Sequence, residues 1–505
     1  MDEEWTVNAN DAITVSLVRP TGSSIEKIGS FNPKITFPIF GEQETIFGYK
    51  GLKINIQYDA RNLRPHFSTS SSKKFKSVGE VEAVDVREVM KDFLPGVAFQ
   101  TLSEYEKALK DLPDSWTPPG VLINTTEQDG ETYEIWKGNL ADPAVKQLLR
   151  RIQINVLFFI EGGSYIGMDA DGNDEPIDSL ARWAVFFIYK REKEGVVPTE
   201  KGQYVFHGFS TIYDFWMYQT PTPPNSPRKG NAPIEPKVDD SWELPKGDLE
   251  LANLPRRARI SQFLVLPPFQ GKGVGALLYD VIFSHYMADA ATQELTVEDP
   301  NEDFDLLRDI CDMKYLRKNV PEFAALKVNS NVPIPRRGGI LHNNTQITLA
   351  KAAGSSANSS ADGIIDVEKL EQIRVKAKIA PRQFSRLVEM HLMSMLPDSV
   401  RPQGDAMSET LDAPPADQKL YTLWRLLLKQ RLYRRNALIL AELELTERIY
   451  KLDETVNNVE WEYARILEHL EPKEETTNNG KRKLEDDAEV EPEPSAKKAR
   501  VDDAA

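Results

Sequence analysis

The feature that most constrains this chain is a short segment in which a strand, a pair of prolines and a glycine-rich turn follow one another. It reads R-I-S-Q-F-L-V-L-P-P-F-Q-G-K-G-V-G-A from Arg259 to Ala276. The run from Ile260 to Leu266 is apolar and rich in strand-forming residues, and Pro267 and Pro268 then remove two consecutive amide donors. We therefore expect pairing with the next strand to fail here, which leaves backbone groups of the strand open to a ligand.

The turn that follows is rich in glycine and leads into an apolar helical run. Gly271, Gly273 and Gly275 alternate with other residues, and A-L-L-Y-D-V-I-F comes directly after them. A turn that opens into a helix N-terminus points several amide hydrogens and the positive end of the helix dipole at one place. The segment predicts a site for a pyrophosphate, although a glycine-rich strand-to-helix turn without a ligand is a common alternative.

Two other phosphate-binding motifs do not match this turn. A P-loop needs Lys followed by Ser or Thr, whereas Lys272 is followed by Gly273. A dinucleotide fingerprint needs the spacing G-x-G-x-x-G and an acidic residue roughly 20 positions later. The glycines here have a different spacing, and the residues near position 291 are A-A-T-Q.

The composition is typical of a globular protein with more than one folded unit. The chain has 505 residues, of which 40% are hydrophobic, so it can bury a sizeable core in two or three units. A single cysteine, Cys311, excludes an internal disulfide and a cysteine-rich zinc site, which is typical of a reducing compartment. The six histidines lack metal-ligand spacing, so we predict no metal.

The net charge and the hydropathy limit the kinds of partner that this chain can bind. The formal net charge of -16 argues against binding to nucleic acid and suits a basic partner. The chain starts with the acidic M-D-E-E-W, and no stretch reaches the roughly 18 apolar residues that a membrane span requires. We therefore expect a soluble intracellular protein that binds neither nucleic acid nor membrane.

Periodicity predicts a mixed α-β fold in several parts. Residues 1–145 combine β-rich runs at 34–40 and 52–58 with a helical run from Ser103 to Leu112, which indicates an N-terminal α+β domain. The next part, 146–352, holds the segment from Arg259 to Ala276 described above, which we call the cofactor segment. Three nearly continuous apolar stretches there predict buried strands of one central sheet, at 151–160, 182–189 and 203–218.

Further along, the pattern alternates between loop and regular structure. The proline-rich stretch at 220–255 predicts a long loop inserted in the central part. A short strand from Glu294 to Val297 and a helix from Pro300 follow the cofactor segment. A Ser, Asn and Gly linker at 354–363 leads into a helical region.

The C-terminal region, 364–470, predicts helices at 367–396 and 416–470. The leucine-rich face of the second helix is more often intramolecular packing than a groove for a partner. Residues 471–505 lack aromatics and predict a disordered charged tail. Its basic clusters at 481–483 and 497–500 are typical of a bipartite nuclear-import signal, and an ordinary mixed-charge tail is an equal alternative.

Three carboxylates near expected strand ends are candidates for a general base: Glu161, Glu298 and Asp299. The period of two places Glu298 and Asp299 on opposite faces unless the strand ends between them. Asp299 also has a structural role available, because Pro300 and Glu302 follow it as in a capping box. We therefore favour Glu298 as the base and interpret Asp299 as partly structural.

Taken together, these residues resemble a known family. Gln270-x-x-Gly273-x-Gly275 resembles the acetyl-CoA loop of the GNAT acetyltransferases, whose pattern is Arg or Gln, two residues, Gly, one residue, then Gly or Ala. Further segments narrow the resemblance to the type B histone acetyltransferases of fungi: F-G-E-Q-E-T-I-F-G-Y-K-G-L at 40–52, F-F-I-E-G-G-S-Y-I at 158–166, R-I-S-Q-F-L-V-L-P-P-F-Q at 259–270, L-T-V-E-D-P-N-E-D-F-D-L-L-R-D at 295–309 and A-P-R-Q-F-S-R-L-V-E-M at 380–390. The likeness runs from about residue 5 to about 396 and implies a GNAT catalytic domain whose mixed sheet is splayed at the cofactor strand.

The resemblance implies acetyl-CoA as co-substrate, with Glu298 as base assisted by Asp299 and Glu161. Pantetheine would lie along the strand backbone, the turn would hold pyrophosphate, and the amide near Val265 or Leu266 would polarise the thioester carbonyl. The cofactor-binding residues are then Phe263, Leu264, Val265, Gln270, Gly271, Lys272, Gly273, Val274, Gly275, Ala276 and, by resemblance, Asn301. The resemblance also implies a histone groove made by Glu44, Thr45, Trp183, Tyr213, Asp214 and Phe215, although Trp183 and Phe215 as plain core residues are the alternative.

The function that this resemblance implies is acetylation of lysines in the N-terminal tail of free, newly made histone H4, by direct attack in a ternary complex. It also implies a WD-repeat β-propeller partner that binds histones, residence in cytoplasm and nucleus, and roles in histone deposition, chromatin assembly, telomeric silencing and DNA repair. Two alternatives stay open at this point. One is an acetyltransferase acting on another protein substrate, and the other is a histone-binding scaffold with weak catalysis.

Overall fold

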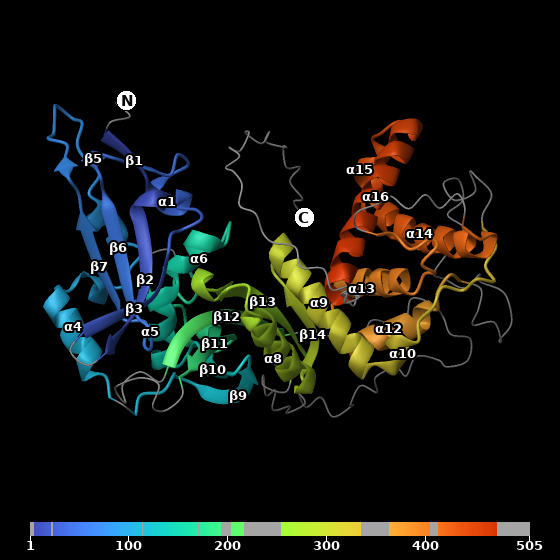
Figure 1. Ribbon diagram of the computed structural model, residues 1–505, viewed down its shortest axis with the longest axis horizontal. Helices are drawn as coiled ribbons and strands as arrows, with labels where there is room; N and C mark the ends of the chain where they lie inside the picture. The colour runs from blue at the N-terminus through green and yellow to red at the C-terminus, as the bar shows by residue number, and fades with distance from the viewer. Residues whose placement is uncertain are drawn as a thin grey trace, which may run out of the picture.

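The computed structural model describes residues 5–21, 24–113, 115–169, 172–192, 204–216, 254–334, 363–403 and 413–471. Most of the expected insertion and linker, and the tail with both basic clusters, lie outside these residues. Figure 1 shows an N-terminal part built on strands, a central sheet, and a C-terminal part built on helices, side by side. The predicted mixed α-β fold class is confirmed.

The N-terminal part is built around a four-stranded sheet in the order β3-β2-β6-β7. Its strands are β2 (Ile13–Thr21), β3 (Ser24–Phe31), β6 (Lys53–Asp59) and β7 (Pro65–Ser70). Two short antiparallel pairs accompany it: β1 (Thr6–Asn8) with β4 (Thr45–Phe47), and β5 (Tyr49–Lys50) with β8 (Lys73–Lys74). The helical elements of this part are α1 (Ala9–Ala12), α2 (Phe37–Phe40), α3 (Val86–Lys91), η2 (Gly96–Phe99) and α4 (Leu102–Asp111).

Two local predictions for the N-terminal part have opposite outcomes. The helix expected near 103–112 is confirmed as α4, which starts with a capping box between Thr101 and Glu104. The strand expected at 34–40 is wrong, because Phe37–Phe40 forms the short helix α2. A proline in its first turn fits a helix start, and Gly41 at φ 77° ends it in a conformation that favours glycine.

The central sheet has six strands in the order β14-β13-β12-β11-β10-β9. They are β9 (Val121–Gln128), β10 (Glu131–Asn139), β11 (Trp183–Arg191), β12 (Tyr204–Trp216), β13 (Arg256–Val265) and β14 (Thr292–Val297). Neighbours are antiparallel except β13 and β14, which are parallel. The strands expected near 182–189, 203–218 and 294–297 are confirmed. The sheet also includes β9 and β10, so it begins before the boundary that the sequence placed at residue 145.

The strand predicted at 151–160 is wrong, because the chain forms α5 (Pro143–Ile152) and α6 (Ile154–Phe159) there. Asp142 caps the first of these helices by accepting a hydrogen bond from the amide of Ala144, and Pro143 occupies its first turn. A short apolar run does not distinguish a buried strand from a buried helix by periodicity alone. The helical signal comes from the cap at Asp142 and from Pro143, which both precede the apolar run.

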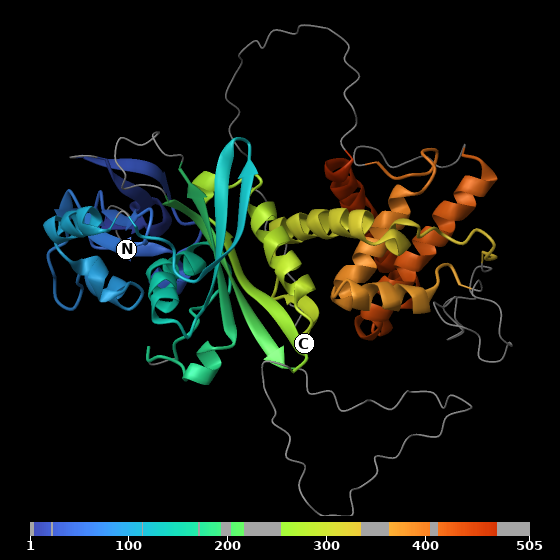
Figure 2. The same cartoon turned by 90° about the horizontal axis from the view of Figure 1, so that it is seen from below.

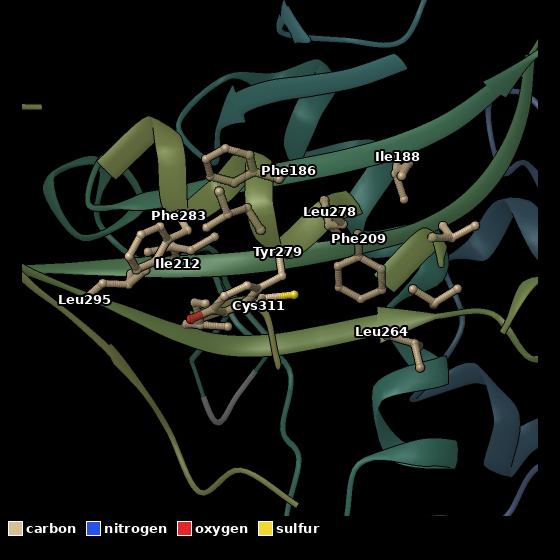
Figure 3. Close-up of a cluster of buried hydrophobic side chains, with 14 of the residues drawn as sticks. Phe186, Ile188, Phe209, Ile212, Leu264, Leu278, Tyr279, Phe283, Leu295 and Cys311 are labelled. Carbon is tan, nitrogen blue, oxygen red and sulfur yellow. The ribbon is translucent and has the colours of Figure 1, made fainter. Parts of the chain in front are cut away.

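Helices α8 (Val274–Ala288) and α9 (Glu302–Asn319) cover one face of the central sheet, and Figure 2 shows the N-terminal part on the other side. Figure 3 shows the core beneath them, where Phe186, Ile212 and Leu295 of the sheet lie with Leu278 and Phe283 of α8 and with Cys311 of α9. All of these side chains are buried. This packing fixes the start of α8, and with it the glycine-rich turn, against the sheet.

The C-terminal part is helical, as predicted, but its helices are shorter than expected. Its elements are α10 (Pro321–Ala324), α12 (Val367–Lys376), α13 (Pro381–Ser394), α14 (Pro415–Arg435), α15 (Ala437–Ala441) and α16 (Leu445–Leu470). Pro381 at the first turn of α13 separates it from α12. In the part of the chain that the structure describes, no helix is both long and apolar enough to cross a membrane.

Candidate active site

The site is built on the edge where β13 and β14 separate. Pairing between these strands ends at Ile260 and Val297, with a last hydrogen bond from the Glu298 amide to the Ile260 carbonyl at 2.9 Å. On its other side β13 stays paired with β12 as far as Val265. The two strands therefore separate earlier than the prolines predicted. Among the described residues, the β14 side of β13 has no strand partner from Ser261 to Val265.

The turn after β13 has the backbone geometry of an anion site. Pro267–Phe269 forms a single 3-10 turn, η4, and Gly271 and Gly273 follow in the left-handed region at φ 73° and 74°. Gly273 is the N-cap of α8, and its carbonyl accepts the hydrogen bond from the amide of Leu277 at 3.0 Å. The amides in the first turn of a helix have no intrahelical partner, so they can bind an anion.

Side chains in this turn stabilise the same backbone path. The Gln270 amide donates to the Val265 carbonyl at 2.7 Å, and the Lys272 ammonium donates to the Pro268 carbonyl at 3.3 Å. A Cβ on Gly275 would lie 2.9 Å from Leu307 Cδ1, so this glycine allows α8 to approach α9 closely. Of the other predicted residues, Val274 is buried under the turn and Ala276 is half-buried.

We expect Gly273→Ala to weaken acetyl-CoA binding by up to about 30-fold. A non-glycine residue in the left-handed region costs roughly 1–2 kcal/mol, which opposes the turn that would hold the pyrophosphate. Titration calorimetry with acetyl-CoA measures the change. Gly130→Ala is the control for the left-handed backbone alone, because Gly130 has φ 80° in the β9–β10 turn and a Cβ there would meet nothing within 4 Å. A Cβ on Gly273 would in addition clash with the side-chain nitrogen of Gln128. Equal weakening in both variants would contradict a local role for Gly273.

His207 lies directly behind this turn. Its ring stacks on Phe269 at a centroid distance of 3.7 Å, its backbone carbonyl accepts from the amide of Leu266, and it is 3% exposed. Burial is the main cause that lowers its pKa from 6.5 to about 4. The unfolded chain therefore binds a proton before the folded chain does, as pH falls below 6.5.

We expect the free energy of unfolding to fall on acidification because of His207. Its contribution is present above pH 6.5 and is lost as pH falls toward 4, by up to about 3 kcal/mol. Urea unfolding at a series of pH values checks this, with His207→Gln as the comparison. The free energy of unfolding should decline less steeply between these pH values in the variant. The same slope in both proteins would contradict the assignment.

Asn301, predicted as a cofactor contact, is the N-cap of α9. Its side-chain oxygen accepts a hydrogen bond from the amide of Phe304 at 2.9 Å. The predicted cap at Asp299 is therefore wrong: the helix starts two residues later than Pro300 indicated, and Asp299 lies in an exposed left-handed turn at φ 35°. The helix start at Asn301 leaves Asp299 without the structural role that the sequence assigned to it.

Glu298 directly follows β14 and contacts two residues of β13. Its Oε2 accepts a hydrogen bond from the Ser261 hydroxyl at 2.5 Å, and its Oε1 lies 3.2 Å from the Arg259 guanidinium. The side chain of Glu298 is 38% exposed, so a substrate can reach it. The sequence reasoning missed Arg259 and Ser261. Both residues belong to the segment R-I-S-Q and lie two positions apart on the strand that carries the site. This spacing could have pointed to them, because residues two apart on a strand face the same side.

The third predicted carboxylate, Glu161, lies in an exposed turn after α6. This turn is tied to the cofactor strand, because the Gln262 side chain donates to the Ser164 carbonyl at 2.7 Å. Gln262 also follows Ser261, which contacts Glu298. The structure therefore brings the Glu161 turn and the Glu298 strand end to the same stretch of β13.

The predicted aromatic residues form one connected surface. Trp183 on β11 pairs with Tyr213 on β12, which pairs with Arg259 on β13, so the three share one face of the sheet. The rings of Trp183 and Tyr213 are 4.7 Å apart, and those of Tyr213 and Phe215 are also 4.7 Å apart. Arg182 lies over Tyr213 at 4.5 Å, and Arg259 lies over Phe215 at 4.6 Å. These rings already bind cations of the chain itself.

The other predicted groove residues lie apart from this aromatic surface. Asp214 alternates with Tyr213 and Phe215 and faces the other side of the sheet, where its carboxylate lies 3.7 Å from Arg256. Burial raises the pKa of Asp214, and the Arg256 cation opposes that change.

Glu44 and Thr45 belong to the N-terminal part. The Glu44 carboxylate accepts from the amides of Thr36 and Phe37 at 2.5 and 3.2 Å and from the Asn10 side chain at 3.0 Å. Thr45 is exposed on β4, opposite Asn8. The described contacts of Glu44 are therefore structural, and they do not join it to the aromatic surface.

For metals, the described stretches contain no group of three or more His, Cys, Asp or Glu side chains that could hold an ion. The predicted site residues place a carboxylate, that of Glu298, next to an open strand edge and near a helix N-terminus.

Comparison with known proteins identifies the family of this chain. Residues 5–161 match the family model described as Histone acetyl transferase HAT1 N-terminus, and residues 348–396 match Fungal HAT1, C-terminal. A protein of Gibberella zeae is 47% identical over 509 residues, and one of Pyricularia oryzae is 42% identical over 505 residues; each comparison covers 99% of both chains. A Neurospora crassa protein is 40% identical over 539 residues, again covering 99% of both. All three relatives are named histone acetyltransferase type B catalytic subunit, and this chain belongs to their family.

Proposed function

We propose that this acetyltransferase moves the acetyl group of acetyl-CoA to lysine side chains in the N-terminal tail of free histone H4, with Glu298 as general base. One observation carries the proposal. An unbroken series of contacts runs from Glu298 through Arg259 to the rings of Phe215, Tyr213 and Trp183. A lysine whose stem lay on these rings would present its ammonium group to the carboxylate.

The chemistry needs a base at that position. A lysine ammonium has a pKa of about 10.4 and must lose a proton before its nitrogen can attack a thioester. Glu298 is exposed enough to accept that proton and is held by two side chains of β13. Asp299 and Glu161 assist in this proposal, because one follows Glu298 in sequence and the other lies in the turn that contacts Gln262.

The residues present also fit acetyl-CoA as the co-substrate. The unpaired edge of β13 from Phe263 to Val265 offers backbone groups to the pantetheine amides, and the start of α8 offers amides to the pyrophosphate. Of the two amides predicted to polarise the thioester carbonyl, that of Leu266 already donates to the His207 carbonyl at 2.9 Å, so the Val265 amide would take this role. Acetyl-CoA supplies the activated acetyl group. The chain's own residues orient it beside Glu298.

Transfer is direct in this proposal, because the described residues near Glu298 offer no cysteine. Cys311 lies on α9, is 5% exposed and packs in the core of Figure 3. Burial raises the pKa of its thiol far above the usual range, which keeps it protonated. We expect Cys311→Ala to retain acetyl transfer in a steady-state assay within about twofold, since no acyl-enzyme forms. Complete loss of turnover in the folded variant would refute direct transfer.

We also propose that the chain works in a complex with a WD-repeat histone-binding subunit, in cytoplasm and nucleus, and takes part in histone deposition. The support is the family membership, because the relatives are named as a catalytic subunit. The GNAT motif of the cofactor turn and the net charge of -16 are consistent with an acyl donor and a basic protein acceptor. Roles in silencing and DNA repair rest on family resemblance alone.

A competition assay tests the choice of substrate. Labelled acetyl-CoA is offered with equal amounts of a histone H4 tail peptide and a lysine peptide of the same net charge from a non-histone protein. We expect label mainly on the histone peptide. Preferential labelling of the other peptide would favour an acetyltransferase with a different substrate. Histone binding without label on either peptide would favour the scaffold alternative.

A further inference from the structure

The strand that carries the cofactor stretch is irregular directly beside Glu298. Ile260 of β13 lies opposite Ile212 of β12, and Gln262 lies opposite Thr211, so Ser261 is an extra residue between two consecutive pairs. An extra residue of this kind bends the strand and redirects a side chain, and such bulges are common next to active sites. Here the redirected hydroxyl is the one that donates to Glu298.

Two different donors hold the two oxygens of the Glu298 carboxylate. Ser261 donates to Oε2 at 2.5 Å, and the Arg259 guanidinium lies 3.2 Å from Oε1. The side chains of Arg259 and Glu298 are 35% and 38% exposed, and an ion pair this accessible to water contributes little to folding stability. What the contacts do is fix the direction of the carboxylate.

Arg259 is itself held on the aromatic surface. Its guanidinium lies 4.6 Å from the centre of the Phe215 ring, and it stands opposite Tyr213 in the sheet. The same strand continues into Phe263, Leu264 and Val265, where the thioester would lie. One strand therefore sets the relative positions of the base, the aromatic surface and the acyl donor.

We propose that Ser261 and Arg259 are positioning residues that aim the Glu298 carboxylate at the substrate amine. This inference rests on the proposed function, because it assumes that Glu298 is the base. Correct placement of reacting groups is a large part of catalysis, and a misplacement of about 1 Å can cost on the order of 10² in rate. A carboxylate released from one donor stays in the site but samples other directions.

The first test is Ser261→Ala, measured by steady-state acetyl transfer to a histone H4 tail peptide. We expect kcat to fall about tenfold while KM for both substrates changes less than about twofold, because binding groups stay in place. Ser261→Thr keeps the hydroxyl and should recover most of the rate. Thr296→Val is the matched control: it removes a hydroxyl that donates to Ala258 across the same strand pair, 3.3 Å away, without touching Glu298. An unchanged kcat in Ser261→Ala, or an equal fall in the control, would overturn the proposal.

The second test is the double variant with Glu298→Gln. If Ser261 acts through Glu298, the alanine substitution should lower kcat no further in the glutamine background. A second tenfold fall there would show that Ser261 acts on something else and would overturn the inference, while leaving Glu298 as base. A wild-type rate in Glu298→Gln alone would instead remove the proposed base, and the positioning role with it.

Discussion

Glu298→Gln is expected to lower kcat for acetyl transfer to a histone H4 tail peptide by about 10² or more. The amide keeps the size and most contacts of the side chain but cannot accept the proton of the lysine ammonium, and a positioned base contributes typically 10²–10⁴ to a rate. KM for acetyl-CoA should stay close to wild type, because the turn from Gln270 to Ala276 does not contact Glu298 in the structure.

The matched control for this prediction is Glu294→Gln. Glu294 lies on β14, which Glu298 directly follows, and it pairs with Arg257 of β13 at 3.1 Å, much as Glu298 pairs with Arg259. Replacing the Glu294 carboxylate with an amide should leave kcat unchanged. Glu161→Gln and Asp299→Asn should each lower kcat less than Glu298→Gln does. A fall below about threefold in Glu298→Gln would contradict the assigned base.

Arg386→Leu is expected to have the largest effect on stability, about 3–5 kcal/mol. Arg386 of α13 lies 2.6 Å from the carboxylate of Asp309 on α9, which is fully buried, and also donates to Glu462 of α16 at 2.5 Å. Burial raises the pKa of Asp309, and the Arg386 cation is the main group that opposes this. Removing the arginine leaves a buried carboxylate with the Gln383 side chain as its remaining described partner, at 2.9 Å.

Urea unfolding followed by helical circular dichroism measures this effect. Lys451→Gln is the control, because Lys451 forms an exposed pair with Glu454 at 3.1 Å and should change the free energy of unfolding by less than about 0.5 kcal/mol. Adding Asp309→Leu to Arg386→Leu should recover much of the loss, since no charge is then buried without a partner. A loss below about 1 kcal/mol in Arg386→Leu would show that this contact does not hold α13 on α9.

The cofactor segment is the part of the fold that the sequence predicted best. Prolines, glycines and apolar residues have strong local preferences, and in the segment from Arg259 to Ala276 those preferences agree with one another. The strand, the turn and the helix all occur where they were expected. The left-handed conformations of Gly271 and Gly273 explain why glycine stands at those positions.

The incorrect predictions arise where one local signal outweighed another. The apolar run at 151–160 fits a buried strand as well as a buried helix, and the deciding cap at Asp142 lies outside the run. At Asp299 the proline that follows matched a helix start, yet Asn301 provides a cap of equal quality two residues later. In each case the choice depends on how the segment packs.

The relation between Glu298 and β13 could not be predicted from local patterns. Arg259 and Ser261 lie about 40 positions before Glu298 in the chain, and the parallel pairing of β13 with β14 alone brings them together. The placement of Asp214 shows the same limit. The family resemblance implied a histone contact for Asp214, whereas strand alternation places its carboxylate near Arg256, on the face away from Tyr213 and Phe215.

The most direct test of the account is transfer of labelled acetyl from acetyl-CoA to a histone H4 tail peptide by the full chain, with acetyl-CoA binding measured in the same preparation. We expect label on a lysine ε-amine of the peptide, and none retained on the protein after the peptide is added. An unlabelled peptide in a preparation that binds acetyl-CoA normally would contradict it.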